Sequence, residues 1–212
     1  MSDVETVRGK NLVIHFEGRR CIHARNCVLM RPDVFVPNVE GEWIHPDAAS
    51  VEAVVALAHA CPSGAIRYER LDGGPAEAAP VVNTVRVREN GPLAVNAEMT
   101  IDGEPTRLRA TLCRCGASQR KPFCDGSHTQ AGFAASGEPP SVESQPLPQR
   151  GGALTITPAP DGPLLLSGSV EIVSGTGRTI DRTNKCALCR CGQSSNKPYC
   201  DGTHRKVGFK ST

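Results

Sequence analysis

One cysteine-rich segment occurs twice in this chain, and no other feature of the sequence restricts its fold as strongly. Residues 113–128 read CRCGASQRKPFCDGSH, and residues 189–204 read CRCGQSSNKPYCDGTH. The two copies align without a gap, so that Cys189 stands 76 residues after Cys113, and the match continues through Gly-Phe at 132–133 and 208–209. Identity at a fixed offset indicates two copies of one structural unit.

Each copy carries three cysteines and one histidine at spacings typical of metal ligands. Cys113 and Cys115 are separated by one residue, so both thiolates can reach one metal ion. Cys124 and His128 are four residues apart, and they converge on one helical face if Asp125 caps a short helix. The second copy repeats this arrangement with Cys189, Cys191, Cys200 and His204. Such a donor set suits an iron–sulfur cluster or a closed tetrahedral zinc site, and spacing alone leaves both open.

Four small residues in the two copies have expected roles of their own. Gly126 and Gly202 lack a Cβ atom, so we expect the backbone to approach each site closely there. Ser118 and Ser194 are expected to hydrogen-bond either a cluster sulfur or the backbone of the loop.

Both segments resemble the CDGSH iron–sulfur domain, the family of mitoNEET, whose pattern is C-x-C-x2-(S/T)-x3-P-x-C-D-G-(S/T)-H. Every fixed position is matched twice here. The resemblance implies one [2Fe–2S] cluster per motif, with two cysteines on one iron and Cys plus His on the other. The implied pairs are Cys113 with Cys115, Cys124 with His128, Cys189 with Cys191, and Cys200 with His204. Family members with two motifs in one chain imply a monomer with internal pseudo-symmetry over roughly residues 80–212.

A second cysteine group precedes the repeats. It comprises Cys21 and Cys27, in the run CIHARNC, and Cys61, which is followed by Pro62. A cubane-binding run uses Cys-x2-Cys-x2-Cys with a distant Cys-Pro, but Ala24 occupies the middle position here. Three thiolates suit a [3Fe–4S] cluster, or a [4Fe–4S] cluster with His23 or an exogenous fourth ligand. Residues 11–70 resemble the divergent single-cluster ferredoxin-like domains found beside CDGSH modules. The alternative is that these cysteines are structural thiols.

These patterns predict an α+β protein with four segments. Residues 1–72 form a small ferredoxin-like α+β domain, residues 80–135 the first CDGSH module, residues 136–152 a Pro-, Ser- and Gly-rich linker, and residues 153–212 the second module. The two modules are expected to form a β-rich pseudo-symmetric pair, with a short helix at each cluster site and the clusters at one end.

Local signals place the main elements. Residues 11–16 alternate as a strand, and a helix is expected from Pro46 to about Ala60. Residues 82–90 and 92–101 alternate apolar and polar side chains around Asn90-Gly91, which predicts a hairpin. Residues 153–172 repeat this pattern around Asp161-Gly162.

Composition excludes several classes of protein. Only 4% of the residues are aromatic, so small modules of this kind are expected to depend on bound metal for stability. The chain begins MSDVETVRGK and has no apolar run of 18 residues, so we expect a cytoplasmic protein without a membrane span. The chain has ten cysteines, several of them in close pairs with a histidine nearby, and in a reducing compartment this pattern favours metal binding over disulfide bonds. A net charge of +2 favours neither nucleic acid nor membrane as a partner.

Two functions follow from these predictions, and the sequence favours the first. The protein passes single electrons between its clusters and an unknown redox partner, or it donates an intact cluster to an apo-protein acceptor. A zinc-stabilised interaction module is a third reading. No nucleophile–base pair and no phosphate-binding loop is recognisable, so no enzyme activity is expected. Cys186 stands outside the motifs, where the first copy has Ala110, and is expected to be a free or partly buried thiol.

Overall fold

The chain divides into two compact units. The computed structural model describes residues 4–102 and 104–211, and its contacts separate residues 1–78 from residues 79–212. The first unit contains the predicted N-terminal domain, and the second contains both cysteine-rich copies with the segment between them. The outermost predicted bounds, residues 1 and 212, lie outside the described residues. Both copies therefore share one folded unit.

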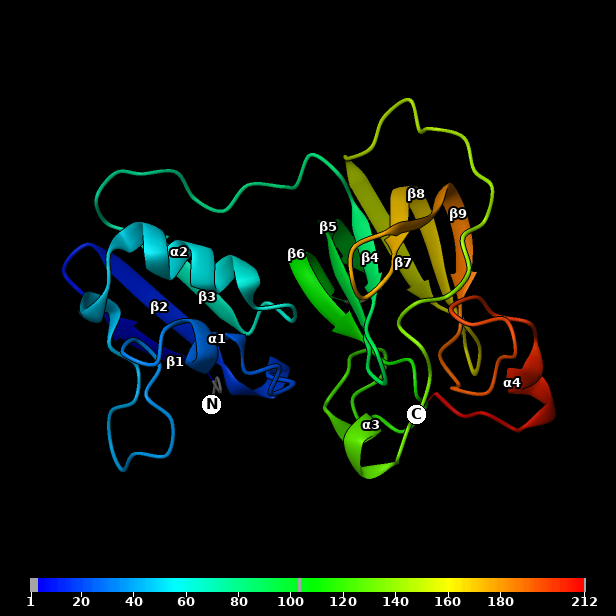
Figure 1. Ribbon diagram of the computed structural model, residues 1–212, viewed down its shortest axis with the longest axis horizontal. Helices are drawn as coiled ribbons and strands as arrows, with labels where there is room; N and C mark the ends of the chain where they lie inside the picture. Colours follow the sequence, from blue (N-terminus) through cyan, green and yellow to red (C-terminus); the bar gives the residue numbers. More distant parts are fainter. Residues whose placement is uncertain (1–3, 103, 212) are drawn as a thin grey trace. The chain divides into compact units, whose positions relative to one another are not determined.

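An antiparallel three-stranded sheet forms the first unit, in the order β1-β2-β3 (Figure 1). The predicted strand of residues 11–16 is its central strand, on which Leu12 and Ile14 are buried. Its elements are β1 (Val4–Arg8), β2 (Leu12–Glu17), α1 (Asn26–Met30), α2 (Val51–Ala60) and β3 (Ile66–Arg70), with 3₁₀ turns at Gly18–Arg20 and Pro46–Ala48.

The helix α2 covers the core of this unit and begins later than predicted. Pro46–Ala48 form a separate 3₁₀ turn, and Ala49 is extended, which interrupts the helical path. Ser50 then caps α2, because its Oγ accepts a hydrogen bond from the Ala53 amide at 3.3 Å. The predicted end at Ala60 is confirmed. The buried face of the helix consists of Val54, Leu57 and Ala58.

The second unit contains two sets of three strands, one before each cysteine-rich motif. The first set is β4 (Thr84–Val87), β5 (Leu93–Ile101) and β6 (Glu104–Leu112), followed by α3 (Ser127–Gln130). The second set is β7 (Ala153–Pro158), β8 (Leu164–Val173) and β9 (Thr179–Leu188), followed by α4 (Thr203–Lys206). Both predicted hairpins are confirmed, since β4 pairs with β5 and β7 with β8 in antiparallel register.

The two sets exchange their first strands. β4 also pairs with β8 in parallel, and β7 also pairs with β5 in parallel. The strands β4, β5, β7 and β8 therefore form a closed circuit, with β6 added to β5 and β9 added to β8. Each set depends on the other for pairing, because its first strand lies between the second strands of both sets.

Alternation along these strands directs one row of side chains into a single core. On β5 the residues Val95, Ala97, Met99 and Ile101 are buried, and the residues between them are exposed or half-buried. The core also includes side chains of the other five strands: Val85, Leu112, Leu154, Ile156, Leu166, Ile172 and Ile180. The protein is thus α+β with strands predominating.

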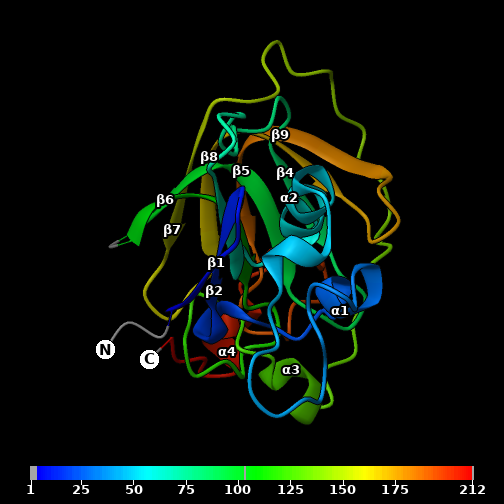
Figure 2. The ribbon, with the colours of Figure 1, turned by 90° about the vertical axis from the view of Figure 1, so that its left-hand side faces the viewer.

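Both short helices of the second unit lie at the same end of its strands (Figures 1 and 2). The reason is that β6 and β9 each lead directly into a motif, which then folds back on the strand that precedes it.

Within the part of the chain that the structure describes, no helix has the length and apolar character needed to cross a bilayer.

The predicted linker, residues 136–152, has no helix or strand but is held against the second unit. The Gly137 amide donates a hydrogen bond to Glu89 Oε2 at 2.5 Å, and the Val142 amide donates one to the Ile180 carbonyl at 2.8 Å. A Cβ atom on Gly137 would lie 2.6 Å from the Glu89 amide nitrogen, so this residue is tightly enclosed. The segment is therefore an ordered loop packed on the second unit and not a flexible linker.

Candidate metal centres

The structure brings the predicted ligands of each motif together as two pairs. In the first motif Cys113 Sγ lies 3.8 Å from Cys115 Sγ, and Cys124 Sγ lies 3.4 Å from His128 Nδ1. The second motif has the same arrangement, with 3.7 Å between the sulfurs of Cys189 and Cys191 and 3.3 Å from Cys200 Sγ to His204 Nδ1. Within residues 4–102 and 104–211, no three His, Cys, Asp or Glu side chains form a group that could hold a single metal ion.

These distances match two ligands on one tetrahedral ion. Metal–thiolate bonds of about 2.3 Å at a tetrahedral angle place two sulfurs about 3.8 Å apart, and replacing one sulfur by a ring nitrogen shortens the distance by a few tenths of an ångström. Each motif therefore presents two half-sites, each spaced for its own ion.

Backbone hydrogen bonds fix the loop that carries these ligands. The Cys113 amide donates to the Pro122 carbonyl at 2.8 Å, and the Cys124 amide donates to the Thr111 carbonyl at 2.9 Å, so the loop closes on the end of β6. Buried Ser118 completes it, because its hydroxyl donates to the Phe123 carbonyl at 2.6 Å. Ser194 does the same for Tyr199 at 2.7 Å in the second copy. Of the two roles predicted for these serines, the structure selects the loop backbone.

The histidine reaches its cysteine by a different route from the predicted one. α3 begins at Ser127 after Gly126, so Cys124 precedes the helix and does not share a helical face with His128. Asp125 organises the turn instead, because its carboxylate accepts hydrogen bonds from the amides of Ser127 at 3.0 Å and Gln119 at 2.8 Å. The second copy shows the same correction, with Gly202 before α4 and Asp201 bonded to Thr203 and Ser195.

The backbone approaches each site at Gly126 and Gly202 as expected, since their amides donate hydrogen bonds to Cys124 Sγ and Cys200 Sγ at 3.4 Å. The expected need for a missing Cβ atom was wrong, because a Cβ atom at either position would meet nothing within 4 Å. Both residues have a positive φ, +90° and +87°, and glycine is needed for that backbone conformation.

Close approach occurs instead at Gly116 and Gly192, which sequence reasoning missed. A Cβ atom on Gly116 would lie 2.8 Å from the Cys191 carbonyl oxygen, and one on Gly192 would collide with the Cys115 carbonyl oxygen. The backbones of the two Cys-x-Cys turns are therefore in van der Waals contact. The sequence does show a glycine directly after each Cys-x-Cys turn. That these two glycines meet could not be predicted, because the contact between the turns depends on the strand exchange.

Ionisation of the thiols in the first motif reflects their pairing. The thiols of Cys113 and Cys115 share a hydrogen bond, which lowers the pKa of Cys113 to about 6 and raises the pKa of Cys115. Burial raises the pKa of Cys124 to about 11. Two thiolates 3.8 Å apart are costly without a cation between them. A bound metal ion would supply that cation and hold both sulfurs deprotonated.

The surroundings of the two motifs differ at one position. Tyr199 of the second motif donates its hydroxyl to Asp181 Oδ2 at 2.7 Å, next to the ligand Cys200. Phe123 of the first motif has no hydroxyl, and the guanidinium of Arg107 lies 4.7 Å from the centre of its ring. The second site thus has a carboxylate nearby where the first has a cation.

Cys186 is a packed thiol on β9. It contacts the hydrophobic core of the second unit, opposite Leu166 on β8. Burial, together with the nearby Asp181 carboxylate, raises the pKa of Cys186 to about 12. These surroundings agree with the predicted partly buried thiol.

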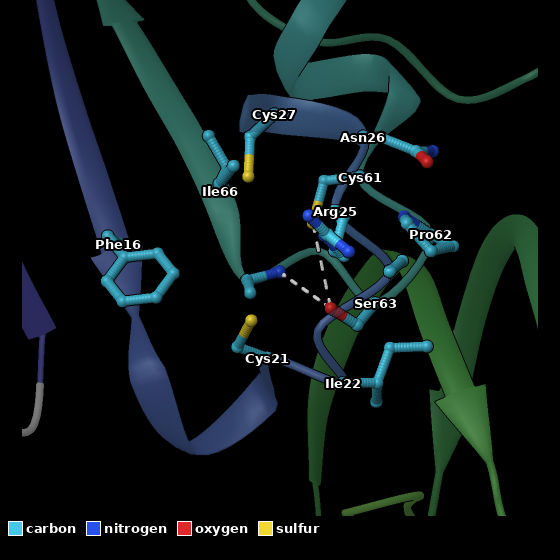
Figure 3. Close-up of a pocket in the computed structure, with 12 residues that line it drawn as sticks. Phe16, Cys21, Ile22, Arg25, Asn26, Cys27, Cys61, Pro62, Ser63 and Ile66 are labelled. Carbon is cyan, nitrogen blue, oxygen red and sulfur yellow. Dashed lines mark hydrogen bonds between the residues drawn. The ribbon is translucent and has the colours of Figure 1, made fainter. Parts of the chain in front are cut away.

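The three cysteines of the first unit line one small cavity. Figure 3 shows the sulfurs of Cys21 and Cys27 directed into the space beside Phe16 and Ile66, and Cys61 lines the same cavity. Burial raises the pKa of Cys21 and of Cys27, and charge on the neighbouring cysteines raises both further. Three cysteines that line one apolar cavity match the number of thiolates expected for a three-thiolate cluster.

His23, the predicted optional fourth ligand, is not among the residues that line this cavity. It is exposed, and its amide donates to Cys21 Sγ at 3.4 Å. The Ser63 hydroxyl lies 3.6 Å from Cys61 Sγ, a contact marked in Figure 3.

Comparison with known proteins matches both regions. The family described as "Iron-binding zinc finger CDGSH type" matches residues 90–129 and again residues 161–205. The family described as "Divergent 4Fe-4S mono-cluster" matches residues 7–71. The uncharacterized protein YjdI of Escherichia coli K12 is 36% identical over 61 residues, which are 28% of this chain and 78% of that protein, and YjdI of strain O157:H7 gives the same values.

Proposed function

Because the chain belongs to the CDGSH family of iron-binding proteins and carries a divergent 4Fe–4S mono-cluster domain, we propose that it transfers single electrons through three iron–sulfur clusters. Each CDGSH motif holds one [2Fe–2S] cluster through three cysteines and one histidine. Cys21, Cys27 and Cys61 hold the third cluster, of the [3Fe–4S] or [4Fe–4S] type. The partner is a separate redox protein, and the chain acts as a monomer.

The pairing of the ligands carries this proposal. A mononuclear zinc site needs four donors around one ion, whereas a [2Fe–2S] cluster needs two donors on each of two irons. In each motif the ligands are close only in pairs, at 3.8 Å and 3.4 Å in the first and 3.7 Å and 3.3 Å in the second. Within residues 4–102 and 104–211 no three such donors surround one position, which supports two ions per motif.

The chain's own residues would set the properties of a bound cluster, which supplies a one-electron couple. The ligands Cys113, Cys189 and Cys191 are buried and Cys115 is half-buried, so protein encloses most of the two-cysteine end of each site; Cys124 at the other end of the first site is also buried. His128 and His204 are half-buried, so the histidine end faces outward. A neutral imidazole in place of a thiolate makes a site less negative, which favours reduction. The strand exchange supports a pseudo-twofold pair in which the two sites lie at one end of a shared body.

Iron and acid-labile sulfide analysis of anaerobically reconstituted protein tests the cluster content. The two motifs should contribute about four irons, and the first unit three or four more. Cys61→Ala should remove only the latter, and Cys186→Ala is the matched control that should leave iron unchanged. Zinc without sulfide would refute the proposal, and an unchanged iron content in Cys61→Ala would refute the third cluster.

Cluster donation is the second candidate, and the outward-facing histidine ends favour it. A half-buried imidazole can be protonated, which would release one iron of the cluster. Incubation with an apo-ferredoxin acceptor distinguishes the two functions. Electron transfer predicts that a redox partner rapidly reduces this protein while all of its clusters are retained. Donation predicts that visible absorbance is lost from this chain and appears in the acceptor.

A further inference from the structure

Each Cys-x-Cys turn contains a buried arginine. Arg114 is only 1% exposed, although it carries a full positive charge. Its guanidinium donates hydrogen bonds to four backbone carbonyls, those of Arg88 at 2.6 Å, Gly91 at 2.9 Å, Ala135 at 3.1 Å and Ser136 at 3.1 Å. Within residues 4–102 and 104–211 none of these bonds goes to a carboxylate. The cation is thus held rigidly without a bonded anion.

Arg190 is its counterpart in the second motif. It is 3% exposed, and it donates to the carbonyls of Gly162 at 2.9 Å and Ala159 at 2.5 Å. Its guanidinium lies 5.5 Å from the ring centre of Phe209, as that of Arg114 lies 5.3 Å from Phe133. Both motifs therefore bury one arginine in the same kind of carbonyl cradle.

A buried cation needs a nearby anion, because desolvation of an unpaired charge costs several kcal/mol. Burial lowers the pKa of Arg114 to about 10, and the anionic group that opposes this most strongly is Cys189 of the second motif. For Arg190, whose pKa burial also lowers, the strongest opposing group is Cys113 of the first motif. Each arginine is thus charge-coupled to a ligand of the other copy, and also to a carboxylate of its own copy, Glu89 for Arg114 and Asp161 for Arg190.

The geometry of the turns explains the crossing. Gly116 follows the first turn and lies so close to the second that a Cβ atom on it would be 2.8 Å from the Cys191 carbonyl oxygen. Gly192 lies in the same way against Cys115. The backbones touch two residues after Arg114 and two residues after Arg190, so the middle of each turn is brought close to the turn that carries the other motif's ligands. The crossed arrangement needs both copies in one unit.

We propose that Arg114 and Arg190 are crossed counter-ions, each balancing the charge of the cluster held by the opposite motif. This inference rests on the proposed function. An oxidised [2Fe–2S] core of charge +2 with three thiolates and a neutral histidine carries a net charge of about −1. One buried arginine per site balances that charge. Reduction adds one electron to the site, so the arginine of the opposite motif stabilises the reduced state and raises its potential.

The test is a redox titration in which the two clusters are told apart. In a His204→Cys background only the first cluster keeps a nitrogen ligand, so pulsed EPR identifies its signal by nitrogen coupling. Arg190→Gln keeps a hydrogen-bond donor and removes the charge. It should shift the potential of the first, nitrogen-coupled cluster downward by more than that of the second. Arg190→Lys should restore most of the shift. Arg120→Gln, in the loop of the first motif and more exposed, is the matched control and should have a smaller effect.

Equal shifts of both clusters, a larger shift of the second cluster, or failure of Arg190→Lys to restore the potential would overturn the inference. If Arg190→Gln lowers cluster occupancy instead, the nitrogen-coupled signal should be the one lost, and loss of the other signal would overturn it. A parent protein that binds no iron and sulfide overturns the proposed function together with this inference. A parent with two clusters but without the crossed effect overturns the inference alone.

Discussion

Contact between the two Cys-x-Cys turns should make Gly116 the least replaceable glycine of the first motif. Gly116 and Gly126 form a natural matched pair, since their φ angles are +85° and +90°. A Cβ atom at Gly126 would meet nothing within 4 Å, whereas one at Gly116 would lie 2.8 Å from the Cys191 carbonyl oxygen. The two alanine variants therefore differ mainly in the collision with the second motif.

The expected magnitudes follow from this difference. Placing an L-residue in the left-handed region costs about 1–2 kcal/mol of unfolding free energy, and Gly126→Ala should cost no more than that. Gly116→Ala carries the same cost plus about 1–3 kcal/mol for overpacking against a backbone that cannot rotate away. It should therefore be destabilised by roughly 2–5 kcal/mol, a large share of the stability of a typical domain.

Urea unfolding of the reconstituted protein under anaerobic conditions measures the difference. Far-UV circular dichroism follows the strands, and visible absorbance follows the clusters. With a typical urea slope, the midpoint of Gly116→Ala should fall about 1 M below that of Gly126→Ala. Because Gly116 contacts the second motif, its substitution should also accelerate loss of the second cluster. Equal midpoints in the two variants would refute the close contact of the turns.

Three further predictions test single features of the second unit. Acidification should accelerate loss of visible absorbance, because protons compete with iron for the imidazole ligands, and replacing His128 and His204 with cysteine should slow that loss. Burial lowers the pKa of His128, so the acceleration at the first cluster should begin below the ordinary histidine pKa of about 6.5. Burial raises the pKa of Cys186 to about 12, so iodoacetamide at pH 8 should alkylate this thiol far more slowly in folded than in urea-unfolded protein. Mass spectrometry measures the alkylation, and equal rates in the two states would contradict the burial of Cys186. Asp181 accepts a hydrogen bond from Tyr199 beside the second site, so Asp181→Asn should raise the potential of the second cluster by on the order of tens of millivolts and leave the first nearly unchanged; a shift confined to the first cluster would show the reverse assignment.

The sequence alone was enough to predict the ligand sets, whose members the structure brings together in pairs, and to identify the repeated unit. Cysteine and histidine at fixed spacing have few uses other than metal binding, so Cys113, Cys124 and His128 could be assigned before any fold was known. Alternation around Asn90-Gly91 likewise predicted the β4–β5 hairpin, because a tight turn and a period of two are local properties. The family match covers both copies of the repeat, and the antiparallel pairing of β4 with β5 confirms the hairpin.

Reasoning from the sequence misjudged two local hydrogen-bonded turns and one segment that is held by distant contacts. The start of α2 depends on the Ser50 cap, and the reach of His128 depends on a turn organised by Asp125 instead of on a shared helical face. Residues 136–152 have the composition of a flexible linker but are bound along the unit by hydrogen bonds to strands far away in the chain.

Only the tertiary structure decided how the two copies combine. The exchange of β4 and β7 closes the circuit of strands and presses the two Cys-x-Cys turns together at Gly116 and Gly192. Each copy read by itself gives no reason for those glycines, nor for an arginine between two cysteine ligands. These residues have an explanation only when both copies fold into one unit. Close backbone contact and a buried charge each require a partner from a distant part of the chain.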